Sequence, residues 1–243
     1  VKFKQAEEIL GWSVLDICQG ESDQLSQTLY TQPALYVVES ILADLLMEQG
    51  ERPNLVAGHS LGEYVALYTA RVFNFEAGLR LVQHRAKLMD SATEGMMVAL
   101  IGFKRLELEE KIQQIQDVVI ANDNSPAQVV ISGRPTAVQD LLSQIKVKRA
   151  VPLKVSGAFH SPLMAQAAAQ FQELLLSVPF ADAQVPVLSN VDPVPTVEAA
   201  TLKHQLQSQI TGSVRWREIS LRLPVEGIEK VVEVGPGDRK SVV

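Results

Sequence analysis

The chain has 243 residues, of which 47% are hydrophobic and 21% charged, so it can bury a substantial core in one large domain or in a domain with an inserted subdomain. Its net charge of −6 at pH 7 argues against a nucleic-acid partner. Cys18 is the single cysteine, which excludes an intrachain disulfide and makes a reducing cytoplasm the expected compartment. No apolar run approaches the roughly 18 residues that a membrane span requires, so no membrane association is expected.

The first part of the chain is predicted to be mainly helical. A helix is expected at 4–18, and a second one from Pro33 to about residue 47, where apolar residues recur at helical spacing. Residues 55–57 form a short apolar run that favours a strand, and 63–70 continue as a helix without a breaker. Asn74 is a candidate cap for a helix that reaches about residue 89.

From about residue 95 the pattern changes to short strands and helices. Strands are expected at 97–101, 118–122, 129–132 and 149–155, and helices at 106–115 and 137–145. This β-α-β-β-α-β order is typical of a ferredoxin-like subdomain, which we assign to residues 95–156.

The larger part of the chain, residues 1–94 and 157–243, is expected to form one catalytic core. Beyond residue 157 the sequence predicts a helix at 163–176, a strand at 185–189, a helix at 197–210 and a last strand at 231–234. Strands that alternate with helices favour a mostly parallel sheet with helices on both faces. The expected fold class is therefore α/β.

The most informative motif is Gly58-His59-Ser60-Leu61-Gly62, which follows an apolar run and precedes a predicted helix. In that context the G-x-S-x-G spacing predicts a nucleophile elbow, whose turn is too sharp for side chains at the two flanking positions. Ser60 would stand at its apex, with the first N–H groups of the helix directed at whatever the serine attacks. A plain tight turn is the alternative interpretation.

A serine at such a turn needs a general base, and histidine is the usual one. Of the four histidines, His59 would point away from the serine, and His84 and His204 lie in helical runs that favour structural roles. His160 lies in a loop between a strand and a helix, where catalytic groups are often displayed. We therefore single out His160 as the candidate base.

The group that orients His160 stays open from the residues alone. Asp182 and Asp192 follow it in the chain, but aspartates in loops are usually surface turn residues. A backbone carbonyl would serve equally well, and a sequence pattern does not reveal one.

Arg85 is the second informative residue. On the helix predicted after Asn74 it shares a stripe with Gly78, Leu81 and Leu88. An arginine among apolar neighbours must reach solvent or find an anion, because an unpaired buried guanidinium is costly. One interpretation is a salt bridge to a nearby Glu or Asp. The other is a clamp for a substrate carboxylate, which a guanidinium binds through two parallel hydrogen bonds.

Other functional motifs are absent from the sequence. It has no phosphate-binding P-loop, no dinucleotide-binding G-x-G-x-x-G and no H-E-x-x-H zinc motif, and neither a metal nor a cofactor is expected. Residues 95–156 carry a group of basic residues, namely Lys104, Arg105, Lys111, Lys146, Lys148 and Arg149. This group is either a solvated face or a docking surface for a partner.

Taken together, several segments resemble the malonyl-CoA:acyl-carrier-protein transacylases of fatty-acid synthesis and the related acyltransferase domains of polyketide synthases. They follow the family's order and spacing across nearly the whole chain. The segments are Thr31-Gln32-Pro33-Ala34, Gly58-His59-Ser60-Leu61-Gly62-Glu63, Val82-Gln83-His84-Arg85, Asn124-Ser125-Pro126, Gly157-Ala158-Phe159-His160-Ser161-Pro162-Leu163-Met164, Val214-Arg215-Trp216 and Glu233-Val234-Gly235-Pro236-Gly237. The resemblance implies an α/β-hydrolase-like core with an inserted ferredoxin-like subdomain.

The resemblance also implies which residues carry out the chemistry. It makes Ser60 the nucleophile and His160 the base. It further implies that the histidine is oriented by a main-chain carbonyl seven residues before Trp216, which is that of Gln209.

Three further roles follow from the same resemblance. Arg85 is implied to bind the malonyl carboxylate, and the backbone N–H of Leu61 to be one oxyanion donor. Phe159, directly before the histidine, looks like the residue of malonyl-preferring members rather than of members shaped for a branched extender.

The implied activity moves a malonyl group from malonyl-CoA, through an ester on Ser60, to the phosphopantetheine thiol of an acyl carrier protein. The expected protein is a cytoplasmic monomer whose partners are malonyl-CoA and that carrier protein. Carrier proteins are generally acidic, so an acidic enzyme would need a local basic face. An acyl-thioester hydrolase with the same Ser60–His160 pair is one alternative, and a non-catalytic module that binds a carrier is another. Fatty-acid and polyketide synthesis both stay open as the pathway.

The sequence departs from the family at its two ends. The family begins with a G-Q-G-S-Q segment whose backbone supplies the second oxyanion donor, whereas this sequence starts at Val1 without it. From that start we expect a further N-terminal segment to precede Val1 in the parent protein. Loss of one such donor typically costs about 10²–10³ in rate. The tail Asp238-Arg239-Lys240 also differs from the family's usual apolar continuation.

Overall fold

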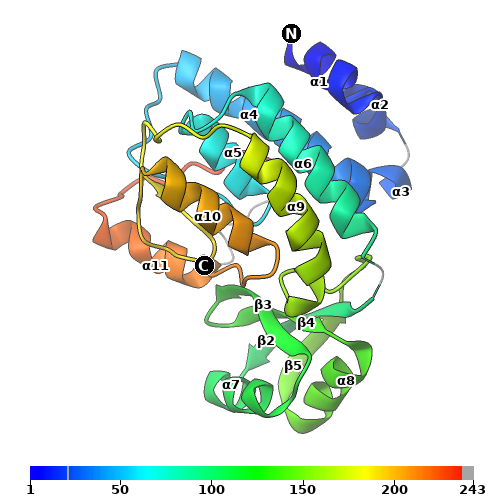
Figure 1. Ribbon diagram of the computed structural model, residues 1–243. Helices are drawn as coiled ribbons and strands as arrows, with labels where there is room; N and C mark the ends of the chain where they lie inside the picture. Colours follow the sequence, from blue (N-terminus) through cyan, green and yellow to red (C-terminus); the bar gives the residue numbers. More distant parts are fainter. Residues whose placement is uncertain (21, 93, 237–243) are drawn as a thin grey trace.

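Helices dominate the first ninety residues of the structure, a computed structural model that describes residues 1–20, 22–92 and 94–236. They are α1 (Lys2–Leu10), α2 (Val14–Gln19), α3 (Ser22–Leu25), α4 (Thr28–Glu48), α5 (Gly62–Thr69) and α6 (Phe75–Asp90). The long helices α4 and α6 pack along each other (Figure 1). Asn74 caps α6 as predicted, since its side chain accepts a hydrogen bond of 2.9 Å from the N–H of Ala77.

Two of these helices differ from the prediction. The helix expected at 4–18 is divided, because Gly11 adopts a left-handed conformation with φ of 79° that ends α1, and Ser13 caps α2. Helix α4 begins at Thr28, so Pro33 lies inside the helix and not at its start. A proline in the second turn removes a single backbone hydrogen bond, and the packing of the buried face of α4 outweighs that loss.

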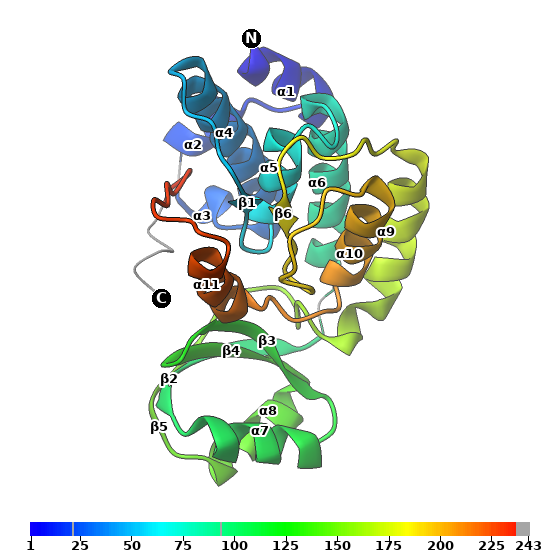
Figure 2. The ribbon, with the colours of Figure 1, turned by 90° about the vertical axis from the view of Figure 1, so that its left-hand side faces the viewer.

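The parallel sheet is much smaller than the sequence predicts. Among the described residues only β1 (Val56–Ala57) and β6 (Val187–Leu188) pair in parallel, and helices surround them (Figure 2). The strand expected at 231–234 does not form; Val231 and Val232 are about half exposed, and no described strand lies beside them. The described sheet of this part is parallel, as expected, but it has only two short strands, because an apolar run becomes a strand only where a neighbour completes its hydrogen bonds.

The remaining helices of this larger part follow residue 160. They are the 3₁₀ turn η1 (Pro162–Met164), α9 (Ala165–Ser177), α10 (Ala199–Gln209) and α11 (Trp216–Val225). The sequence does not predict α11, which contains Pro224 and has no side-chain cap. The expected turn Gly235-Pro236-Gly237 lies partly outside the described residues, and the tail Asp238-Arg239-Lys240 lies wholly outside them.

A second, antiparallel sheet is formed within residues 96–152. Its strands are β2 (Met96–Phe103), β3 (Val118–Ser125), β4 (Gln128–Gly133) and β5 (Val147–Pro152), arranged in the order β3-β4-β2-β5. Helices α7 (Arg105–Gln114) and α8 (Pro135–Gln144) cover the face of the sheet that is turned away from the other helices (Figure 2). The elements follow one another in the predicted order.

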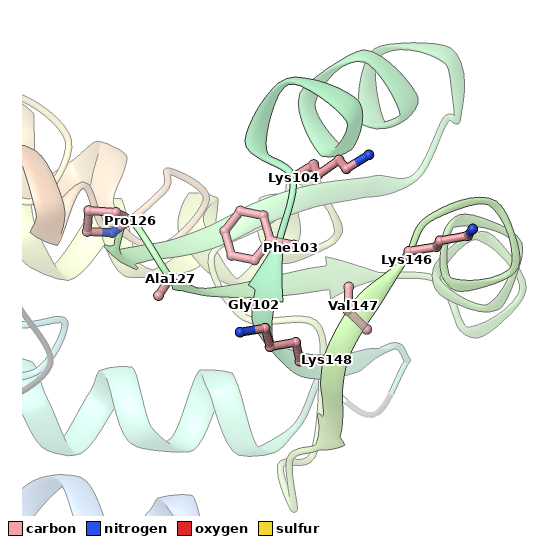
Figure 3. Close-up of a pocket in the computed structure, with 8 residues that line it drawn as sticks. All are labelled: Gly102, Phe103, Lys104, Pro126, Ala127, Lys146, Val147 and Lys148. Atoms are coloured by element: carbon pink, nitrogen blue, oxygen red, sulfur yellow. The ribbon is translucent and has the colours of Figure 1, made fainter.

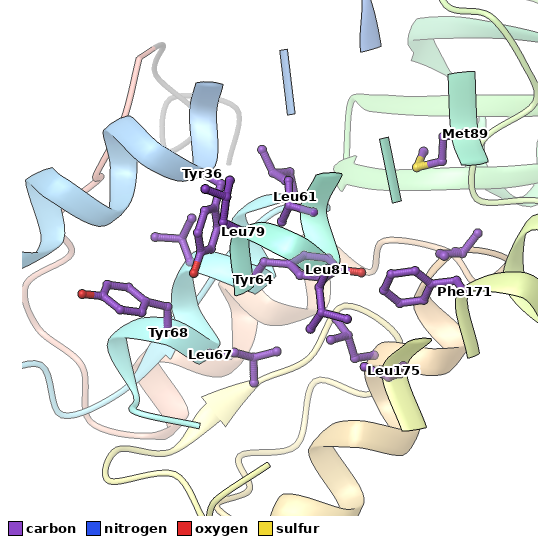
Figure 4. Packing of buried hydrophobic residues seen from close by; sticks show 14 of the residues in the cluster. Tyr36, Leu61, Tyr64, Leu67, Tyr68, Leu79, Leu81, Met89, Phe171 and Leu175 are labelled. Atoms are coloured by element: carbon purple, nitrogen blue, oxygen red, sulfur yellow. The ribbon is translucent and has the colours of Figure 1, made fainter. Parts of the chain in front are cut away.

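The structure has two hydrophobic clusters, and the larger one extends onto one face of the antiparallel sheet through Met97, Ala99, Ala121 and Val130. In the larger one, aromatic and aliphatic side chains from α4, α5, α6 and α9 interlock, among them Tyr36, Tyr64, Leu81 and Phe171 (Figure 4). The smaller cluster lies between the antiparallel sheet and its two helices and includes Leu100 and Leu141. Burial of these side chains is the main force that holds each part together.

Strand β3 connects the two parts directly. The N–H of Asp123 donates to the carbonyl of Val214 over 2.9 Å, and the N–H of Val214 donates to the carbonyl of Ala121 over 2.8 Å. The Asp123 carboxylate also accepts from Arg105 on α7 at 2.8 Å and from Arg217 on α11 at 2.9 Å. The antiparallel sheet is therefore fastened to the segment that leads into α11. No helix of the described residues is both long and apolar enough to cross a membrane.

Candidate active site

Ser60 stands on a strained turn between β1 and α5. Its φ is 53°, which is uncommon for a residue other than glycine and is typical of an elbow serine. A Cβ on Gly58 would lie 2.0 Å from the Gly62 backbone, so the turn requires glycine at this position. A Cβ on Gly62 would meet nothing within 4 Å. The expected steric need for glycine therefore holds at Gly58 and is wrong at Gly62.

Asn190 braces this turn from the end of β6. Its side-chain oxygen accepts from the N–H of Ser60 at 2.7 Å, and its side-chain nitrogen donates to the carbonyl of Gly58 at 2.6 Å. The buried Glu63 accepts from the N–H of Asn190 at 3.1 Å. Sequence reasoning misses Asn190, although its place just after a strand that pairs in parallel with β1 is a usable signal, since such strand ends lie side by side.

His160 meets Ser60 across a separation of 100 residues. The distance from Ser60 Oγ to His160 Nε2 is 2.8 Å. On the other side of the ring, Nδ1 lies 2.9 Å from the carbonyl of Gln209 and 3.2 Å from that of Gly212. Carbonyls only accept, so Nδ1 carries the proton and Nε2 is left to accept one from the serine.

The surroundings keep His160 neutral. Its side chain is buried, and burial followed by the positive charge of Arg85 lowers its pKa from 6.5 to about 3. A neutral imidazole whose Nε2 carries no proton is the form that a general base requires. The residue is also strained, with a φ of 55°, and such strain is common where the fold positions a functional side chain.

Arg85 is the largest fully buried side chain, 1% exposed, and its guanidinium is directed at the serine. Its Nη2 donates to Ser60 Oγ at 3.0 Å and to Gln209 Oε1 at 3.2 Å, while Nη1 donates to Gln32 Oε1 at 2.6 Å. The Tyr64 ring lies alongside, 5.5 Å from Cζ. No carboxylate of the described residues forms an ion pair with it, so the interpretation of Arg85 as a structural salt bridge is wrong for this part of the chain.

Leu61 and Phe159 flank the pair of Ser60 and His160. The N–H of Ser60 is used by Asn190, and those of Gly62 and Glu63 are used within the turn. Within the described part of the chain no hydrogen bond uses the N–H of Leu61, which leaves it available beside the serine. Phe159 is buried in the larger hydrophobic cluster, directly before His160.

The other candidates from the sequence lie apart from the Ser60 hydroxyl. His59 Nε2 is 2.9 Å from Asn124 Oδ1 on β3, and His84 and His204 lie on α6 and α10. Asp182 Oδ1 accepts from the N–H of Ala199 at the start of α10, and Asp192 accepts from Gln205 at 3.4 Å. Neither aspartate is hydrogen-bonded to His160, and the two backbone carbonyls fill that position.

The arrangement can activate the Ser60 hydroxyl and can bind an anion at the Arg85 guanidinium next to it. A base and a cation both contact Ser60 Oγ, and α5 begins two residues after the serine. Within the described ranges no group of three or more His, Cys, Asp or Glu side chains is placed to hold a metal ion.

The α/β fold and the Ser60–His160 contact define a class of α/β proteins with a serine–histidine site. Within that class, the family model described as the acyl transferase domain matches residues 4–236, and the chain belongs to this family. A malonyl CoA-acyl carrier protein transacylase of Synechocystis sp. is 55% identical over 236 residues, which cover 97% of this chain and 80% of the relative.

Solved structures show the same likeness. The crystal structure of the malonyl-CoA:ACP transacylase of Synechocystis sp. PCC 6803 superimposes with a TM-score of 0.97 at 54% identity, covering 99% of this chain and 83% of that one. A malonyl-transacylase in complex with a type II PKS acyl-carrier protein gives a TM-score of 0.92 at 36% identity, covering 97% and 80% of the two chains.

Proposed function

We propose that this chain transfers a malonyl group from malonyl-CoA to an acyl carrier protein through an ester on Ser60. The observation that carries this proposal is the pair of contacts at Ser60 Oγ, 2.8 Å from the base nitrogen of His160 and 3.0 Å from Arg85 Nη2. A serine hydrolase needs a base to activate its nucleophile, but it needs no cation beside that nucleophile. A buried cation at the nucleophile suits an acyl group that itself ends in a carboxylate.

In the first half of the reaction His160 Nε2 takes the proton of the Ser60 hydroxyl, and Oγ attacks the thioester carbon of malonyl-CoA. The oxyanion of the tetrahedral intermediate accepts a hydrogen bond from the N–H of Leu61. When the C–S bond breaks, the proton on His160 passes to the departing sulfur, so CoA leaves as a thiol. The malonyl group remains on Ser60, with its carboxylate held by Arg85.

In the second half the phosphopantetheine thiol of the carrier protein replaces CoA. His160 takes the proton of that thiol, the sulfur attacks the ester carbon, and the Ser60 oxygen leaves and recovers the proton. The carbonyl of Gln209 orients His160 in both halves, which it can do without a buried aspartate. We assign Phe159 to the wall of the acyl pocket and to a preference for an unbranched malonyl group.

We infer finer features of the molecule from the same observations. Residues 95–156 are proposed as a ferredoxin-like subdomain, supported by the strand order β3-β4-β2-β5, and residues 1–94 and 157–243 as an α/β-hydrolase-like core. Acidic carrier protein and malonyl-CoA are the proposed partners. We propose that the protein works as a cytoplasmic monomer without a metal or cofactor.

Acyl-enzyme mass spectrometry tests the transferase directly. Incubation with malonyl-CoA adds one malonyl group to the peptide that contains Ser60, and a Ser60→Ala variant gains none. Addition of a carrier protein whose phosphopantetheine thiol is free then removes the label from Ser60 and yields malonyl-carrier. Release of the label mainly as free malonate in the presence of carrier would instead support the acyl-thioester hydrolase, and a chain that never takes up malonyl would be the non-catalytic carrier-binding module.

A further inference from the structure

The guanidinium of Arg85 is held in place without a hydrogen bond to any carboxylate of the described residues. Within the described part of the chain, the two hydrogen-bond acceptors other than the serine are side-chain amides, Gln32 Oε1 at 2.6 Å and Gln209 Oε1 at 3.2 Å. The amides are themselves buried, with Gln32 8% and Gln209 0% exposed. A buried arginine normally has a carboxylate partner, so two neutral holders at one guanidinium form an unusual arrangement.

The orientation of the Gln209 amide is determined by its other contacts. Its nitrogen donates to Glu63 Oε2 at 2.8 Å and to the carbonyl of Ser60 at 2.9 Å, so its oxygen must face Arg85. Glu63 is the nearest acidic group along this chain of contacts, and Gln209 stands between it and the guanidinium. Burial raises the pKa of Glu63 above its ordinary value. Glu63 therefore acts on Arg85 only through space, and its direct hydrogen bond is with the Gln209 amide.

Gln32 reaches the same guanidinium from a different helix. It lies on α4, and its nitrogen is directed at the sulfur of Met89 over 3.4 Å, which leaves its oxygen for Arg85 Nη1. Each amide accepts a hydrogen bond from a different nitrogen of the guanidinium. Gln32 is 53 residues and Gln209 is 124 residues away from Arg85 in the chain. An amide oxygen fixes the guanidinium plane by its dipole but adds no negative charge.

We propose that Gln32 and Gln209 are specificity-determining positioning residues, which hold the Arg85 guanidinium free of any directly bonded carboxylate, so that it can bind acyl groups that end in one. The proposal rests on the function proposed above. A carboxylate in place of either amide would occupy the guanidinium permanently, and the substrate carboxylate would have to compete with it. Gln209 also carries the carbonyl that orients His160, so Gln32 is the cleaner position to change.

The experiment replaces Gln32 by a near-isosteric acid. In Gln32→Glu the new carboxylate lies on Arg85 Nη1, and we expect the ratio of kcat/KM for malonyl-CoA to that for acetyl-CoA to fall at least tenfold, mainly through the KM for malonyl-CoA. Gln32→Met removes the acceptor without adding charge, and we expect the same ratio to fall by a smaller factor, about threefold. Gln49→Glu is the matched control, because it makes the same change at the exposed end of α4, about 25 Å along the helix.

The outcomes separate this proposal from the one it rests on. Failure of the unchanged protein to form malonyl-Ser60 overturns the proposed function itself. If the unchanged protein is malonylated and Gln32→Glu keeps the same malonyl-to-acetyl ratio, only the role of Gln32 is overturned. The role of Gln32 is also overturned if Gln32→Glu unfolds at the same temperature as the unchanged protein and its kcat/KM falls equally for malonyl-CoA and acetyl-CoA. If Gln32→Glu fails to fold, the test rests on Gln32→Met. An unchanged malonyl-to-acetyl ratio of kcat/KM in that variant contradicts the proposal.

Discussion

At the scale of single residues, the site concentrates its chemistry on one oxygen atom. Ser60 Oγ is contacted by a neutral imidazole at 2.8 Å and by a charged guanidinium at 3.0 Å. Two non-glycine residues with positive φ, Ser60 and His160, bring their side chains to this point. The backbone strain there is offset by the hydrogen bonds of the brace and the two carbonyls.

The carboxylate clamp predicts a selective effect at Arg85. In Arg85→Ala, acylation of Ser60 by malonyl-CoA should fall roughly tenfold or more relative to acylation by acetyl-CoA, because charged hydrogen bonds contribute about 1.5–3 kcal/mol. Rates of acyl-enzyme formation with the two thioesters measure the ratio. Equal losses for both acyl groups would refute the clamp.

The low pKa of His160 predicts how stability depends on pH. The histidine is neutral in the folded protein down to about pH 3, whereas in the unfolded chain it takes up a proton below about pH 6.5. The unfolded state thus binds more protons between these limits, and the free energy of unfolding should fall as the pH drops from about 6.5 towards 3.

Urea titrations at a series of pH values measure this dependence. The comparison is with His160→Gln, in which the titrating group is gone and other residues are unchanged. The variant should lose less stability over that pH range than the unchanged protein. Identical slopes for the two would mean that His160 titrates normally in the folded state.

At the scale of elements, the strand-to-helix turn depends on one glycine and one asparagine. Gly58 is required because the Gly62 backbone passes where its Cβ would be, while Asn190 ties the turn to the end of β6. The parallel pair β1 and β6 is short, but it places the ends of both strands side by side. The position of the serine therefore rests on this small pair of strands.

The two glycines of the motif should respond differently to substitution. Gly58→Ala places a methyl group against backbone that cannot yield cheaply, so the melting temperature should fall by several degrees. Gly62→Ala meets open space at the first residue of α5, where alanine favours the helix, and its melting temperature should stay the same or rise. Calorimetry on both variants gives the answer, and a larger loss for Gly62→Ala would contradict this account of the turn.

At the scale of the whole molecule, the antiparallel sheet presents a basic end. Lys104, Lys146 and Lys148 line an open pocket of about 520 Å³ together with Phe103 (Figure 3). Lys146, Lys148 and Arg149 are exposed at the start of β5. In a chain with a net charge of −6, such a local group is suited to attract an acidic carrier protein.

Charge reversal tests this docking surface. Glutamate at Lys146, Lys148 and Arg149 should raise the KM for the carrier protein and leave the kinetics with malonyl-CoA alone unaffected. The same reversal at the exposed Lys4, Arg52 and Arg80 is the control for net charge. An unchanged KM for the carrier, or an equal rise in the control, would exclude this surface.

The sequence by itself predicts the parts of the site that local pattern encodes. The glycine spacing around Ser60, the loop position of His160 and the apolar stripe that contains Arg85 are all visible without a structure, and so is the strand–helix order of residues 95–156. Each depends on residues a few positions apart, whose geometry is set by backbone conformation.

The tertiary structure alone decides which distant side chains meet. The brace from Asn190 and the holders Gln32 and Gln209 join residues more than fifty positions apart, and no local period encodes such contacts. The same holds for the choice of a carbonyl over Asp182 or Asp192 and for the small size of the parallel sheet. Hydrogen-bond partners and strand neighbours are selected when the packed core brings elements together, because only there must every buried polar group find a partner.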